Sequence, residues 1–182
     1  MSTPTIKVDR YIQAHLSNFG GVRRGGTKMI VLHTSTGSLS SMDNWFSRDH
    51  RPFGMAQSSA HFGVGLDGIL HQYVREDLVA YHGGFVENTS NPIVKAFWSK
   101  YRYSPNDYAI GIEHVDNMKP FTIKRTKQQL DQSIELCVYL CKKYNIEPTA
   151  QSIIGHRVFR PSKGCPGNLP VNTIISAVKT LV

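Results

Sequence analysis

Short apolar segments alternate along this chain with polar and glycine-containing connections. Met29–His33, Ala109–Val115 and Ile153–His156 are short, apolar and β-prone, which is typical of strands buried in a sheet. Ala60–Gly65 and Ile69–Val74 are two further strand-like runs, and the Asp-Gly pair between them predicts a hairpin. Leu78–Tyr81 fits a short additional strand.

A second pattern, with helical spacing, follows the three strands at Met29–His33, Ala109–Val115 and Ile153–His156. Thr126–Tyr144 is the clearest helix, because Thr126 and Gln129 form a capping-box pattern and apolar residues recur every three or four positions after them. Val171–Leu181 predicts a closing helix, and Ser40 or Ser41 is the expected cap of a short one. Residues 83–107, with the Asn91-Pro92 break, are expected to form a long loop, of a length that is usually functional or partly self-structured.

Interleaved strands and helices with one hairpin predict an α/β fold, a single mixed central sheet flanked by helices. The 182 residues suit one domain, spanning 1–182, in which 1–28 form a weakly patterned N-terminal extension before a core at 29–170. We expect a monomer.

The charge of the chain narrows its partners only slightly. Lys and Arg number 21 against 13 Asp and Glu, so the net charge of +8 favours polyanions: nucleic acid, an anionic membrane face or the bacterial wall. The basic residues are dispersed, without the dense arm of a nucleic-acid-binding tail. No apolar run is long enough for a transmembrane segment. The N-terminus has no secretory pattern, which predicts synthesis in the cytoplasm without a signal peptide.

Histidine and cysteine positions indicate candidate chemistry. His33 and His156 each end an apolar strand, and Cys165 lies nine positions after His156 in a Gly/Pro-containing loop. Nitrogen and sulfur donors of this kind suit zinc, which keeps three protein ligands in catalytic sites. Each residue taken alone is also compatible with a core histidine or an idle loop thiol. Cys137 and Cys141 lie four apart on a helix and are expected to pack as apolar residues.

Four ordered segments resemble the zinc amidase family that includes phage lysozyme-type amidases, muropeptide-recycling amidases and peptidoglycan-recognition proteins. They are Val31-Leu32-His33-Thr34; Ser59-Ala60-His61-Phe62 with Leu66-Asp67-Gly68; Ala109-Ile110-Gly111-Ile112-Glu113; and Ile154-Gly155-His156 through Lys163-Gly164-Cys165-Pro166-Gly167. Each motif is weak alone, whereas the ordered set is specific and spans residues 29 to 170.

The resemblance implies a role for each matching residue. His33, His156 and Cys165 fall on the zinc ligands, so one catalytic Zn²⁺ is expected. Glu113 falls on the glutamate of the recycling-type branch and Lys163 on the family's lysine near the metal cysteine. His82 matches a pocket histidine that does not usually bind the metal and is expected to contact substrate.

One departure from the family concerns the general base. The lysozyme-type branch places a catalytic tyrosine where this chain has Ala60, so Glu113 is the expected base. Lys163 and zinc are then expected to stabilise the tetrahedral oxyanion. His61 is expected to be structural, and His114 to face the other side of the sheet from Glu113 because side chains alternate along a strand.

The leading hypothesis is an N-acetylmuramoyl-L-alanine amidase that cuts the lactyl amide bond between MurNAc and L-Ala, in a phage-type endolysin. Its partner is then peptidoglycan or a muropeptide, and it acts on the bacterial wall. A cytoplasmic anhydro-muropeptide recycling amidase and a non-catalytic peptidoglycan-binding protein are the alternatives. A nucleic-acid protein with a structural zinc site is disfavoured, because such a site closes with four ligands at tight spacing.

Overall fold

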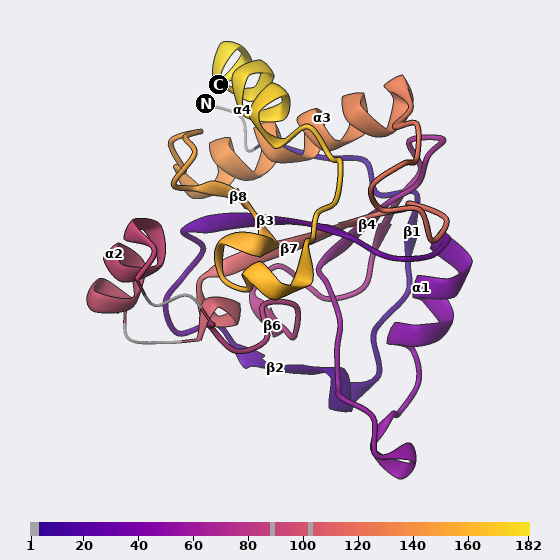
Figure 1. The fold of residues 1–182 in the computed structure, drawn as a ribbon. Coiled ribbons are helices and arrows are strands. Elements are labelled where there is room, and N and C mark those ends of the chain that lie inside the picture. The colour runs from indigo at the N-terminus through magenta and orange to yellow at the C-terminus, as the bar shows by residue number, and fades with distance from the viewer. Residues whose placement is uncertain (1–3, 88–89, 102–103) are drawn as a thin grey trace.

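The computed structural model of the chain describes residues 4–87, 90–101 and 104–182. Within these residues, six strands form a mixed sheet in the order β1-β5-β4-β7-β3-β8 (Figure 1). In that order they span Arg10–Tyr11, Leu70–Gln72, Phe62–Val64, Ala109–His114, Met29–Thr34 and Ile153–Gly155. The predicted α/β fold with a mixed central sheet is therefore confirmed.

The strands that matter for function run parallel. β3 pairs in parallel with β7 on one side and with β8 on the other, and β7 also pairs in parallel with β4. β4 and β5 form the predicted antiparallel hairpin. Because β3, β7 and β8 run the same way, residues at their carboxyl ends meet at one edge of the sheet.

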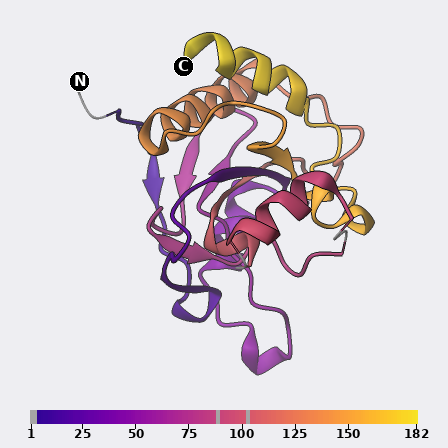
Figure 2. The same cartoon turned by 90° about the vertical axis from the view of Figure 1, so that its left-hand side faces the viewer.

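The helices are Leu39–Phe46 (α1), Pro92–Tyr101 (α2), Lys127–Tyr144 (α3) and Val171–Leu181 (α4). Figure 2 shows α3 and α4 lying together over one face of the sheet. Two expectations were wrong. Ser38, not Ser40 or Ser41, caps α1 by accepting a hydrogen bond from the Ser41 N–H. The segment predicted as a long loop contains α2.

Alternate residues of β3 face two different cores. Ile30 and Leu32 pack in the cluster that contains Leu136 and Leu140 of α3. Met29 and Val31 belong to a second cluster on the other face, with residues such as Phe159. His33 continues the Met29–Val31 series, so its side chain lies on the face away from α3.

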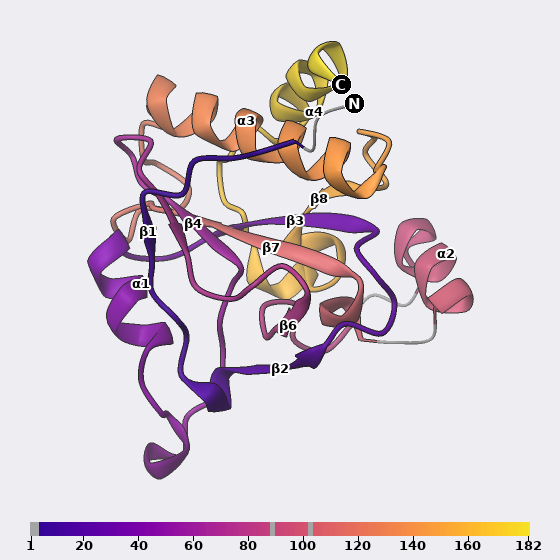
Figure 3. The same ribbon diagram turned by 180° about the vertical axis from the view of Figure 1, so that it is seen from behind.

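A second, two-stranded sheet lies on the side of the main sheet that faces away from α3 (Figure 1). It pairs Phe19–Val22 (β2) with Leu78–Ala80 (β6) in antiparallel fashion. Seen from behind (Figure 3), the chain runs from β1 at the sheet edge down to β2. In the described part of the chain, no helix combines the length and apolar character needed to cross a membrane.

Thr126 links the N-terminus of α3 to the β4–β5 hairpin. Its hydroxyl accepts a hydrogen bond from the Gln129 N–H at 3.1 Å and donates to the Leu66 carbonyl. We expect Thr126→Ala to lower the free energy of unfolding by about 1–2 kcal/mol, because both contacts are lost. Urea titration measures this effect. Thr126→Ser keeps the hydroxyl and should lose little, and equal losses in both variants would contradict the capping role.

Candidate metal centre and active site

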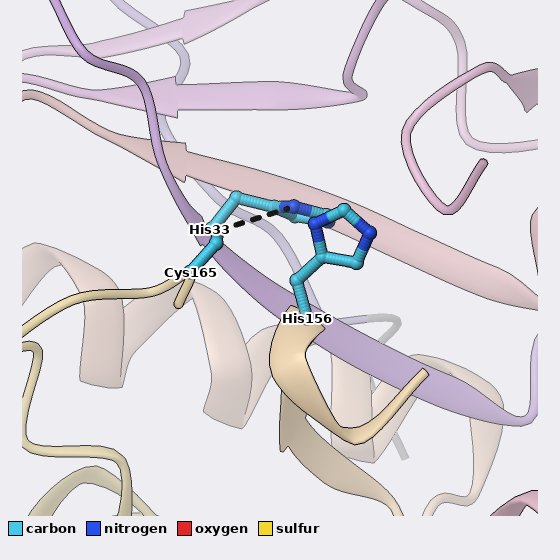
Figure 4. Close-up of side chains that lie close together, drawn as sticks. All are labelled: His33, His156 and Cys165. Atoms are coloured by element: carbon cyan, nitrogen blue, oxygen red, sulfur yellow. Dashed lines mark hydrogen bonds between the residues drawn. The ribbon is translucent and has the colours of Figure 1, made fainter. Parts of the chain in front are cut away.

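Three potential metal ligands converge at the carboxyl edge of the sheet. His33 lies on β3, His156 follows β8 directly, and Cys165 lies in the loop beyond it (Figure 4). Their ligand atoms all lie within 4.8 Å of one another, and Cys165 Sγ is 3.8 Å from His33 Nδ1. Residues 132 positions apart in sequence therefore form one group of two nitrogens and one sulfur.

Strand register explains why the two histidines meet. Leu32 of β3 pairs with Gly155 of β8. The next residues, His33 and His156, therefore lie side by side at the carboxyl ends of two adjacent parallel strands. Cys165 is held beside them by the loop backbone, because the Arg157 N–H donates to the Cys165 carbonyl at 2.7 Å. The Arg157 guanidinium also donates to the carbonyls of Gly164 and Gly167. Burial raises the pKa of the Cys165 thiol, and the Thr34 N–H, which donates to Cys165 Sγ at 3.3 Å, partly offsets that rise.

The environment of His156 determines which of its ring nitrogens can bind a metal. His156 Nε2 lies 3.1 Å from the Gly83 carbonyl oxygen. A carbonyl only accepts, so Nε2 carries the hydrogen and Nδ1 presents its lone pair to the group. Burial lowers the pKa of both His33 and His156, which keeps the imidazoles neutral as metal ligands require.

Glu113 lies beside this group because β3 and β7 pair His33 with Glu113. Its Oε1 is 3.9 Å from His33 Nδ1. Its Oε2 is buried and hydrogen-bonds to none of the described residues. Burial, and secondarily the charge of Asp116, raise the pKa of Glu113 to about 8. A buried carboxyl group with one unsatisfied oxygen and a raised pKa has the features of a proton-transfer residue.

Lys163 lies at the entrance to the same site. It is exposed, and it lines the cavity that also contains the ligand group and Glu113. This cavity continues into a larger groove beside α1, walled by Ser41, Trp45 and hydroxyl side chains. Thr34, Thr36, His82, Glu113 and Lys163 line both spaces. A substrate in the groove can therefore reach the ligand group.

His82 was expected to contact substrate, and it lines both cavities although it is largely buried. It also contacts a candidate ligand directly, because its Nδ1 lies 3.0 Å from His33 Nε2. Burial lowers the pKa of His82 to about 3. Its contact with substrate stays a prediction.

The other two histidines singled out in the sequence lie outside the ligand group. His114 faces α3, as strand alternation predicts, and its Nε2 lies 2.9 Å from Ser133 Oγ. His61 accepts the Gly111 N–H at Nδ1, and its Nε2 lies 2.7 Å from the Arg23 guanidinium. These contacts agree with the structural role expected of His61.

Asp116 was missed by the sequence analysis. It is fully buried, and its Oδ2 accepts hydrogen bonds from Thr34 Oγ1 at 2.5 Å and from the Thr36 N–H at 3.1 Å. The Arg125 guanidinium donates to the same Thr34 hydroxyl at 3.0 Å. The network fixes the backbone after His33, including the N–H that meets Cys165. The only signal for Asp116 in the sequence was its position as an acidic residue directly after the predicted strand Ala109–Val115.

A sequence profile described as N-acetylmuramoyl-L-alanine amidase matches residues 23–168 of this chain. The chain belongs to the N-acetylmuramoyl-L-alanine amidase family. The match covers both strand-end histidines, Glu113 and the Cys165 loop, and membership supports peptidoglycan amidase activity. Comparison with curated proteins gives no match.

Solved structures share the fold of this amidase. A selenomethionine derivative of AmpD has a TM-score of 0.70 at 22% identity, covering 98% of both chains. The endolysin amidase LysCS from Clostridium intestinale has a TM-score of 0.64 at 21% identity, covering 93% of this chain and 95% of LysCS. Drosophila PGRP-LB has a TM-score of 0.61 at 23% identity, covering 89% and 87%. At these identities the likeness shows the fold alone.

Proposed function

We propose that this chain is a zinc-dependent N-acetylmuramoyl-L-alanine amidase that hydrolyses the lactyl amide bond between MurNAc and L-Ala. The observation that carries the proposal is the convergence of His33, His156 and Cys165 beside Glu113. Two nitrogens and a thiol sulfur are a donor set that suits zinc, and three ligands leave a coordination position for substrate chemistry. The group fits the metal that the family resemblance implies.

The chain's own residues then have distinct tasks. Zinc, when bound, supplies a Lewis acid for the carbonyl and activates water at neutral pH. Glu113 takes a proton from the attacking water and delivers it to the leaving amine as the carbon–nitrogen bond breaks. With zinc bound, Glu113 lies near positive charge, which favours the carboxylate form that the first step needs. The positive charge of the Lys163 ammonium helps to stabilise the negative charge of the tetrahedral oxyanion.

We place this activity in a lytic, phage-type setting that acts on the bacterial cell wall. The net charge of +8 favours approach to an anionic wall polymer. The open groove beside α1 also gives access to an extended polymer. Recycling of anhydro-muropeptides and binding without hydrolysis are the competing roles. Cys165 opposes binding without hydrolysis, because it completes the three-ligand group that a catalytic zinc site needs.

Release of stem peptide from purified sacculi tests the proposal. Zinc-loaded protein should release peptides with a new L-Ala amino terminus, and treatment with a chelator should stop release until zinc is restored. Cleavage that survives complete metal removal overturns the zinc mechanism. Activity on soluble anhydro-muropeptides without activity on sacculi assigns the recycling role. Binding to sacculi without cleavage assigns the recognition role.

A further inference from the structure

We propose that His82 is a positioning residue that fixes the tautomer of His33 and so directs His33 Nδ1 to the metal. The inference rests on the proposed metal role of His33. His82 is expected to contact substrate, and the inference gives it a second task inside the protein. The argument follows the hydrogen-bond directions from one backbone carbonyl to the ligand group.

The chain of hydrogen bonds begins at an acceptor, the backbone carbonyl of Ala109. Its carbonyl oxygen lies 3.2 Å from His82 Nε2, and a carbonyl only accepts, so this nitrogen carries the hydrogen. The single N–H of a neutral His82 is thereby used, and its Nδ1 is an acceptor. His33 Nε2 lies 3.0 Å from that acceptor and must donate to it.

The consequence falls on the other nitrogen of His33. With its hydrogen on Nε2, His33 presents a bare lone pair at Nδ1. Nδ1 is the atom that lies 3.8 Å from Cys165 Sγ and 3.9 Å from Glu113 Oε1. His82 therefore does for His33 what the Gly83 carbonyl does for His156.

The fold holds the His82 ring in place from two sides. The backbone N–H groups of His82 and Gly83 both donate to Asn106 Oδ1, at 3.3 and 2.7 Å. The ring lies directly over Gly111 of β7, where a Cβ would come within 2.4 Å of His82 Cγ. The rings of His82 and His33 meet edge to face, with centroids 5.1 Å apart. A glycine at position 111 is thus needed for the ring to reach His33.

Zinc affinity, measured by competition with a chelator, tests the proposal without relying on catalysis. His82→Phe keeps a ring but loses the acceptor, and we expect zinc affinity to fall about 10–100-fold, the range for outer-shell partners of a metal ligand. His82→Asn places an amide oxygen near the position of Nδ1 and should recover most of that loss. His71→Phe is the matched control, since His71 and His82 are both 8% exposed and His71 lies outside the ligand group. It should bind zinc like the wild type.

A second readout uses the metal-free protein. Imidazole nitrogen chemical shifts of His33 should show hydrogen on Nε2 in the wild type and lose that preference in His82→Phe. Gly111→Ala removes no polar group yet displaces the ring, so it should weaken zinc binding as His82→Phe does.

The inference is overturned by wild-type zinc affinity in folded His82→Phe, or by hydrogen on His33 Nδ1 in the metal-free wild type. Equal losses in His82→Phe and His82→Asn also overturn it and assign a packing role. A wild type that does not bind zinc instead refutes the proposed metal site, and the nitrogen shifts still decide the tautomer.

Discussion

Glu113→Gln is expected to lower kcat for release of stem peptide by about 10²–10⁴-fold, the contribution typical of a positioned general base. The amide has nearly the shape of the carboxyl group but accepts no proton. Zinc content should stay at the wild-type level, because Glu113 is not one of the three donors that converge. Kinetics on sacculi with the metal content of each preparation measure both quantities. Full activity in a zinc-loaded variant removes Glu113 as the base.

The same substitution should stabilise the metal-free protein at high pH. The pKa of Glu113 rises from 4.5 to about 8 on folding, so its contribution to stability is complete below pH 4.5 and is lost as the pH rises through 8. Glutamine does not titrate and escapes that loss. We expect the unfolding free energy of Glu113→Gln, relative to wild type, to be about 4 kcal/mol more favourable at pH 8.5 than at pH 4.5. A difference independent of pH would show that the carboxylate is not buried at a cost.

These two effects together describe an exchange of stability for function. A carboxyl group with a buried, unsatisfied oxygen destabilises the charged folded state, and catalysis needs that group to take up and release a proton. The strand that carries it is apolar from Ala109 to Ile112, with Ile110 and Ile112 fully buried. Glu113 is thus a local exception to the pattern of its own strand, and such exceptions concentrate at functional sites.

The central strands and their polar ends could be predicted from sequence because local pattern and tertiary position agree there. β3 and β8 are buried parallel strands, which appear in a sequence as short apolar runs. A histidine that closes such a run must lie at the carboxyl edge of the sheet, and two such strands side by side bring their histidines together. The pairing of β3 with β8 itself was not visible in the sequence.

The error over residues 83–107 has a specific cause. Asn91-Pro92 was interpreted as a break, whereas proline suits the first turn of a helix because its missing N–H needs no partner there. The Asn91 side chain accepts a hydrogen bond from the Ile93 N–H at 2.9 Å, as a capping residue does. The same dipeptide thus marks a loop or a helix start, and the residues after it decide between the two.

The contacts that support the site could not be predicted, because they join distant segments. His82 meets His33 across 49 positions, and Asp116 meets Thr34 across 82. Neither contact leaves a periodic signal in the chain. β1 could not be predicted either. It has only two residues, and they form a strand because they pair with β5 at the open edge of the hairpin. Sequence pattern and family resemblance together located the candidate reacting groups, while the surroundings that orient them required the fold.

Cys165→Ser is expected to weaken zinc binding more than about 100-fold, beyond the loss caused by outer-shell changes, and to abolish amide hydrolysis with it. Serine is nearly the same size, so the loop should keep its conformation, but its hydroxyl is a poor zinc ligand beside a thiolate. Zinc should also stop protecting the variant against unfolding. In the wild type, free zinc at 100 times Kd should add about 2.7 kcal/mol of stability. Thermal unfolding with and without zinc measures this difference.

Cys141→Ala is the matched control for the loss of a thiol. Cys141 lies in α3, is 1% exposed and packs in the core on the opposite face of the sheet from His33. Its removal should cost stability in the presence and absence of zinc alike, because only packing is lost. Zinc affinity and hydrolysis should both stay at wild-type levels. A Cys165→Ser protein that still gains zinc-dependent stability would place the metal elsewhere, whereas loss of that gain in both variants would trace it to the integrity of the fold rather than to one sulfur ligand.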